Sequence, residues 1–142
     1  MGYIFAIIAG AAMSIQGVMN TRLGEKTGLF LANSYVQGTA FLLSLIVLLF
    51  AKDNNFKAFG EVKKLYLFGG VLGLVITITV MQAVKGTSPA IAVSTILVSQ
   101  LICAAVIDAL GLMETQKLAF GWNKYLGALI MIAGVILFKW KI

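Results

Sequence analysis

A small set of hydrogen-bonding side chains stands inside otherwise apolar stretches of this 142-residue sequence. Amides and hydroxyls can both donate and accept hydrogen bonds, so they are the groups most able to hold a polar solute. The candidate substrate-binding residues are Gln16, Asn20, Asn33, Gln37, Gln82, Ser94 and Gln100.

One acid, Asp108, also falls within an apolar stretch. A carboxylate in a membrane span is costly and needs a partner or a function. Two interpretations remain open: capping or pairing with a lysine near the membrane surface, or proton or cation coupling. The sequence contains no histidine, and no two acids fall at a common depth. It therefore lacks the groups for acid–base catalysis or a metal triad, and we expect no enzyme activity, no cofactor and no metal site.

The elements that position these residues are predicted to be transmembrane helices. The chain is 61% hydrophobic and 11% charged, whereas soluble domains are about half apolar and about a quarter charged. The charges cluster and leave five segments near the ~20 residues that a helix needs to cross a bilayer. We expect helices at 3–21, 29–51, 65–84, 89–110 and 121–139, forming one all-α transmembrane domain over residues 1–142, with Arg22 to Gly28 as the first loop.

The polar residues should gather in one half of the membrane, because successive spans run in opposite directions. Those that fall near the same membrane surface are Gln16, Asn20, Asn33, Gln37, Gln82 and Ser94. Helical spacing also places Asn33 and Gln37 on one face. This polar layer is interpreted either as hydrogen-bonding glue between helices or as the lining of a cavity for a solute.

Small residues predict close helix packing elsewhere. Gly69 and Gly73 form a Gly-x-x-x-Gly pattern, and Gly127 and Gly134 lie one heptad apart in the last segment. Such residues let membrane helices approach closely, within a chain or between chains.

The basic residues give almost no preferred orientation. On the side of the N-terminus, called side A, the predicted loops and ends place Lys52, Lys57, Lys63, Lys64, Lys117 and Lys124. On the opposite side, called side B, they place Arg22, Lys26, Lys85, Lys139 and Lys141. Orientation follows the Lys/Arg excess on the cytoplasmic side, and six against five leaves both a weak single topology and a dual topology open. The formal net charge of +6 suits anionic lipid headgroups as partners and gives no reason to expect nucleic acid.

Several of these residues resemble a known family. The stretch from Thr87 through Pro89 and the closing run from Gly127 to Gly134 and beyond resemble the last two helices of a drug/metabolite transporter repeat. The run from Gln16 to Gly24, and that from Gln100 through Asp108 to Gly111, resemble the small five-helix YdcZ-type family of that superfamily.

The resemblance implies that this chain equals one half of a ten-helix inverted-repeat transporter, with the solute site between the first four helices of each half. It also implies a multi-pass protein of a bacterial inner membrane. The small multidrug resistance branch carries a glutamate in the middle of its first helix, which this sequence lacks, so antiport of cationic drugs by that mechanism is not implied.

We therefore expect a transporter for a small polar or amphipathic solute that works by alternating access as a two-chain dimer, either antiparallel or paired with a related chain. A dual-topology channel and an accessory or structural subunit of a heterodimer are the alternatives.

Overall fold

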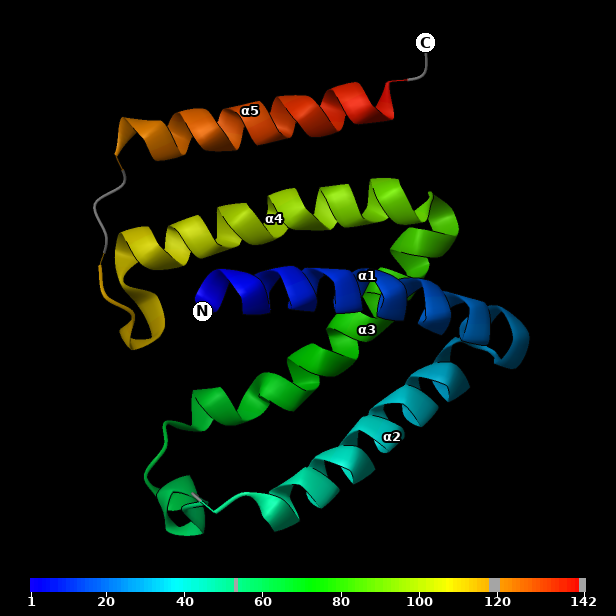
Figure 1. Ribbon diagram of the computed structural model, residues 1–142, viewed down its shortest axis with the longest axis vertical. Helices are drawn as coiled ribbons and strands as arrows, with labels where there is room; N and C mark the ends of the chain where they lie inside the picture. The colour runs from blue at the N-terminus through cyan, green and yellow to red at the C-terminus, as the bar shows by residue number, and fades with distance from the viewer. Residues whose placement is uncertain (53, 118–120, 141–142) are drawn as a thin grey trace. The chain divides into compact units, whose positions relative to one another are not determined.

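The computed structural model describes residues 1–52, 54–117 and 121–140, and every regular element in these ranges is a helix (Figure 1). The α-helices are α1 (Gly2–Thr27), α2 (Leu29–Phe50), α3 (Gly69–Gly86), α4 (Pro89–Leu110) and α5 (Trp122–Lys139). Short 3-10 turns occupy Phe56–Gly60, Lys64–Phe68 and Leu112–Glu114. The described chain contains five helical segments that are long and apolar enough to cross a membrane, which confirms the predicted fold class. Lys141, counted above on side B, lies outside the described residues.

The ends of α4 follow directly from its sequence. The Ser88 hydroxyl accepts a hydrogen bond from the Ile91 backbone N–H at 3.3 Å, and Pro89 occupies the first turn. A serine cap and an early proline are both favourable at a helix N-terminus. The helix stops at Gly111, whose φ of 64° lies in the left-handed region that glycine adopts without strain.

The first helix is longer than the sequence predicts. Its expected end was Thr21 and its expected loop Arg22 to Gly28, but α1 continues to Thr27. Arg22 and Glu25 form an ion pair at 2.9 Å across one helical turn, so charged residues extend the helix beyond its apolar part instead of ending it. Gly28, with a φ of 95°, alone separates α1 from α2.

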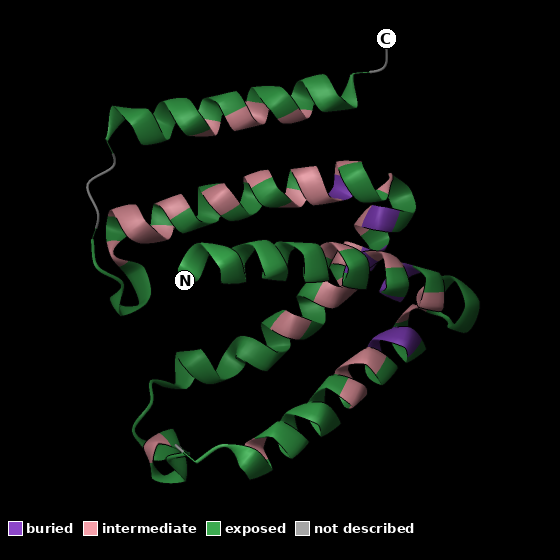
Figure 2. Cartoon of the chain, in the orientation of Figure 1, coloured by how far each residue is buried: buried purple, intermediate pink, exposed green. Residues whose placement is uncertain are grey.

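The helices group into two compact units, residues 1–86 and residues 87–142. In the first unit α1, α2 and α3 all contact one another, and in the second unit α4 packs against α5. Figure 2 shows how little of the first unit is buried, and most large apolar side chains are exposed. Exposed apolar surface of this extent is expected of helices whose solvent is lipid. The buried residues of the first unit are Gly17, Asn20, Thr21, Ala32, Asn33, Met81 and Val84.

Close packing in the first unit depends on glycines of α1. A Cβ atom added at Gly24 would lie 2.6 Å from Met81 Cε, and one added at Gly17 would lie 3.1 Å from Val80 Cγ1. Both glycines therefore let α1 and α3 approach closely. Of the glycines predicted to mediate packing, Gly73 faces Gln37, whose Nε2 would be 3.8 Å from an added Cβ.

The other predicted packing glycines have open space beside them. No described atom lies within 4 Å of a Cβ added at Gly69, Gly127 or Gly134. Their role in packing against a second chain stays a prediction.

Candidate solute site

The buried polar side chains of the first unit come from α1 and α2, close to the turn that joins these helices. Asn20 and Thr21 of α1 are 7% and 4% exposed, and Asn33 of α2 is 4% exposed. The Thr21 hydroxyl donates to the Gly17 carbonyl oxygen at 2.7 Å and lies 3.5 Å from the Met81 carbonyl oxygen. The Thr21 hydroxyl therefore spends its one proton on a backbone carbonyl, and its oxygen can still accept a hydrogen bond.

Asn33 is the unusual member of this group. Its Oδ1 atom is buried and has no hydrogen-bond partner among the described residues. A buried polar atom without a partner is rare in native structures and loses the hydrogen bonds that water would have made. Such an atom fits a site that is completed by something other than this single chain.

One turn further along α2, the amide of Gln37 has a partner. Its Nε2 donates to Thr77 Oγ1 of α3 at 3.3 Å, and the Thr77 hydroxyl donates to the Gly73 carbonyl oxygen at 2.9 Å. This chain of hydrogen bonds fixes the register of α2 against α3. Gln37 therefore acts as a link between helices, whereas Asn33 on the same face does not.

A cavity of about 190 Å³ opens at this end of the first unit. It is lined by Thr21, Gly24, Glu25, Gly28, Leu29, Met81, Gln82 and Lys85. The lining combines an anion, a cation, an amide and a hydroxyl with the thioether of Met81. Such a cavity can hold a small polar solute by hydrogen bonds and by charges of both signs.

The other predicted binding residues lie outside this group of buried residues. Gln16 is exposed, and Gln82 lines the cavity while remaining exposed. Ser94 and Gln100 belong to the second unit, where the Ser94 hydroxyl donates to the Ala90 carbonyl oxygen of its own helix at 2.7 Å and Gln100 is exposed.

The sequence analysis did not single out Gly17, Thr21, Gly24, Thr77 or Met81 as site residues. Gly17, Thr21 and Gly24 recur at i, i+4 and i+7 and so share one face of α1. That small-residue spacing is the signal that could have found this face.

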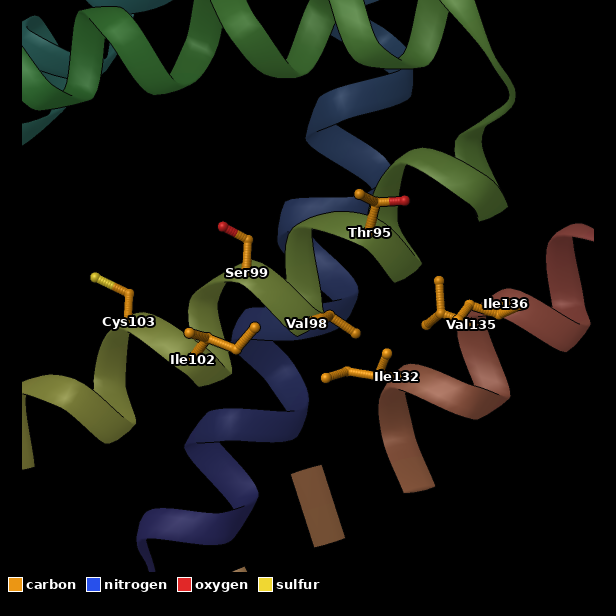
Figure 3. A pocket seen from close by; sticks show the side chains of 8 residues that line it. All are labelled: Thr95, Val98, Ser99, Ile102, Cys103, Ile132, Val135 and Ile136. Carbon is orange, nitrogen blue, oxygen red and sulfur yellow. The ribbon is translucent and has the colours of Figure 1, made fainter. Parts of the chain in front are cut away.

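Among the described residues of the second unit, two further cavities lie between α4 and α5. Figure 3 shows the larger, of about 440 Å³, in which Thr95, Ser99 and Cys103 from α4 and mostly isoleucine and valine side chains from both helices form the lining. Its walls are largely apolar, as expected of a groove filled by lipid or by another helix.

The smaller cavity, of about 330 Å³, contains both Asp108 of α4 and Lys124 of α5 in its lining. The predicted intramembrane acid thus shares a cavity with a lysine, while its pairing or coupling role stays a prediction. The described residues contain no group of three or more His, Cys, Asp or Glu side chains that could hold a metal ion.

The sequence matches one known protein family. The chain matches the family described as "Putative inner membrane exporter, YdcZ" over residues 1–137. No curated protein and no solved structure was found to match it. The family match and the five spans make this a multi-pass inner-membrane transport protein. The chain belongs to the YdcZ-type family of drug/metabolite transporters.

Proposed function

We propose that the protein works as an antiparallel homodimer of ten helices and moves a small polar or amphipathic solute by alternating access. Each chain would supply one solute-binding half, and the two halves would exchange roles between the outward-open and inward-open states. Inverted repeats serve this purpose in many transporters.

The observation that carries this proposal is the one-sided burial of the first unit. On α1 burial begins at Gly17, on α2 it does not extend beyond Asn33, and on α3 it begins at Met81. The buried polar groups are therefore confined to the end where α1 meets α2. An inverted second chain places the same groups near the opposite membrane surface, so that both surfaces acquire an equivalent site.

The charge distribution supports the same arrangement. Six basic residues on one side and five on the other give the chain little preference for either orientation. Both orientations are then populated in one membrane. A closed two-fold dimer of oppositely inserted copies satisfies the common symmetry of oligomers.

The proposal is tested by forcing the orientation. Ala58→Lys with Glu61→Lys adds two lysines to side A, and Thr27→Lys with Gly86→Lys adds two to side B. The first pair lies in the loop between α2 and α3, and the second pair lies at the ends of α1 and α3. Each double variant should insert in a single orientation, and glutamine at the same positions provides the matched control.

Copurification of two differently tagged copies is the measurement. A side A variant should copurify with a side B variant, but hardly with a second copy of itself. The glutamine controls should copurify in every combination. Copurification of a side A variant with itself, at the level of the controls, would show a parallel dimer and overturn the proposal.

Flux through liposomes that contain only this chain separates the classes of function. A transporter gives flux that saturates with the concentration of a polar solute, and a channel gives flux that does not. An accessory subunit gives no flux in a screen of polar solutes with and without a pH gradient.

A further inference from the structure

We propose that the solute site takes a small, electrically neutral solute, zwitterions included, which donates a hydrogen bond to Asn33 Oδ1 after the Met81 side chain moves aside. This inference rests on the proposed function, because it names the class of solute for that site. It depends on three features of the first unit: unpaired acceptors, the absence of charged side chains around Asn33, and a methionine at the level of Asn33.

The inner part of the site offers acceptors. Asn33 Oδ1 is buried without a partner, and Thr21 Oγ1 has already committed its proton to the Gly17 carbonyl oxygen. A solute that enters this region gains most by presenting N–H or O–H groups. The donor that the protein does not supply to Asn33 would then come from the solute.

The spans around Asn33 carry no charged side chain. No Asp, Glu, Lys or Arg occurs in α1 before Arg22, in α2, or in α3 before Lys85. The charged groups lie outside them, where Glu25 and Lys85 line the cavity at the membrane surface and Arg22 forms an ion pair with Glu25. A solute with a net charge would leave its countercharge behind on reaching Asn33, and an uncompensated charge is unfavourable at membrane depth.

Met81 is a buried residue of the cavity lining and lies at the level of Asn33 by helix register. The Gln37–Thr77 hydrogen bond sets the register of α2 and α3. Asn33 lies one turn from Gln37 on α2, and Met81 lies one turn from Thr77 on α3. Met81 is 2% exposed, lines the cavity and reaches the space above Gly24. Asn33 is not part of the cavity lining.

A methionine side chain is unbranched and flexible, so it can leave this position without moving the backbone. The 190 Å³ beyond it equals the liquid volume of about six water molecules. The site therefore suits a solute of a few heavy atoms, or the polar end of a larger amphipathic one.

Thiol reagents of different charge test this class directly. Asn33→Cys is made in a Cys103→Ser background, purified in detergent, and treated with methanethiosulfonates that carry a hydroxyl, a trimethylammonium or a sulfonate end. Each rate is divided by the rate of the same reagent at Gln82→Cys, which lines the outer cavity and is exposed.

The normalised rate of the neutral reagent should exceed both charged rates by at least about tenfold. Met81→Ala should raise the neutral rate at Asn33→Cys by about tenfold, because Met81 is buried and lines the cavity, and its truncation opens space toward Asn33 on our proposal. Val84→Ala is the matched control, since Val84 is a buried apolar residue of the same helix that does not line the cavity. It should leave the rate unchanged.

Two results would overturn the proposal. A trimethylammonium rate equal to the neutral rate would contradict the neutral class, and equal acceleration by Val84→Ala would contradict the role of Met81. If Asn33→Cys fails to fold, Thr21→Cys, which lines the cavity, takes its place in the comparison of reagents. The preference for neutral reagents does not depend on how the two chains are oriented. A failed charge preference and a failed antiparallel dimer are therefore separate results.

Discussion

Replacing the two amides of α2 by leucine should change stability in opposite directions. Asn33 and Gln37 lie one turn apart, but only Gln37 has a hydrogen-bond partner, Thr77 Oγ1 at 3.3 Å. An amide buried without a partner costs about 1–3 kcal/mol in proteins. Asn33→Leu removes that cost and keeps the same number and branching of side-chain heavy atoms, so we expect the free energy of unfolding to rise by about 1–2 kcal/mol.

Gln37→Leu should lower the free energy of unfolding. It deletes a bond between helices, and such bonds contribute about 0.6 kcal/mol on average in membrane proteins. The Thr77 hydroxyl keeps its own bond to the Gly73 carbonyl oxygen, so no buried donor is left unpaired and the loss should stay near that value. Together the two variants should differ by about 2 kcal/mol.

The free energy of unfolding is measured by denaturant titration of the two purified variants and the unmodified chain in the same detergent. Flux of a transported solute is recorded beside it. Asn33→Leu should be the more stable and the less active variant, because it removes the acceptor for the solute. Destabilisation by Asn33→Leu equal to or greater than that by Gln37→Leu would show that Asn33 is packing glue, and the reasoning would fail.

Three further substitutions test the packing of particular helices. Gly134→Leu should weaken dimerisation, measured by chemical crosslinking, and leave the stability of the chain itself unchanged, because no described atom lies within 4 Å of a Cβ at Gly134; an unchanged dimer would contradict a packing role. Ser88→Ala should lower the free energy of unfolding by about 1 kcal/mol through loss of the cap on the Ile91 N–H, and thermal unfolding with Ser88→Thr as a control checks this. Gly17→Leu should destabilise by about 1–3 kcal/mol, since its Cβ would already lie 3.1 Å from Val80 Cγ1; stability equal to that of Gly10→Leu, which has open space, would contradict it.

The helices could be predicted from the sequence because apolar length and charge clustering decide whether a segment spans a membrane. The bounds of α4 agree with the expected range 89–110, since Ser88, Pro89 and Gly111 are strong local signals. The end of α1 differs from the expected one because a charged residue is a weaker signal for a helix end than a cap residue or a glycine. Arg22 ends the apolar part of α1, but the helix itself continues to Thr27.

The candidate site could be predicted only in part. Asn20 and Asn33 are buried in the region where the polar layer was expected, while Gln16 is exposed. The sequence singles out the amides Gln16 and Asn20 on α1, but the packing of this helix is directed by Gly17, Thr21 and Gly24, because small residues decide where helices can approach. Which amide finds a partner depends on the register between α2 and α3, and no spacing within one helix determines that register.

The most direct test of the proposed dimer is the orientation of the unmodified chain in cells. A single cysteine is placed at Asn55, an exposed residue of the loop between α2 and α3, in the Cys103→Ser background. A membrane-impermeant maleimide is then applied to intact and to opened cells, with Gln116→Cys as a second reporter on side A. The antiparallel dimer predicts that about half of the copies react in intact cells and that the rest react only after opening. Labelling from one side alone at both positions would contradict the antiparallel homodimer.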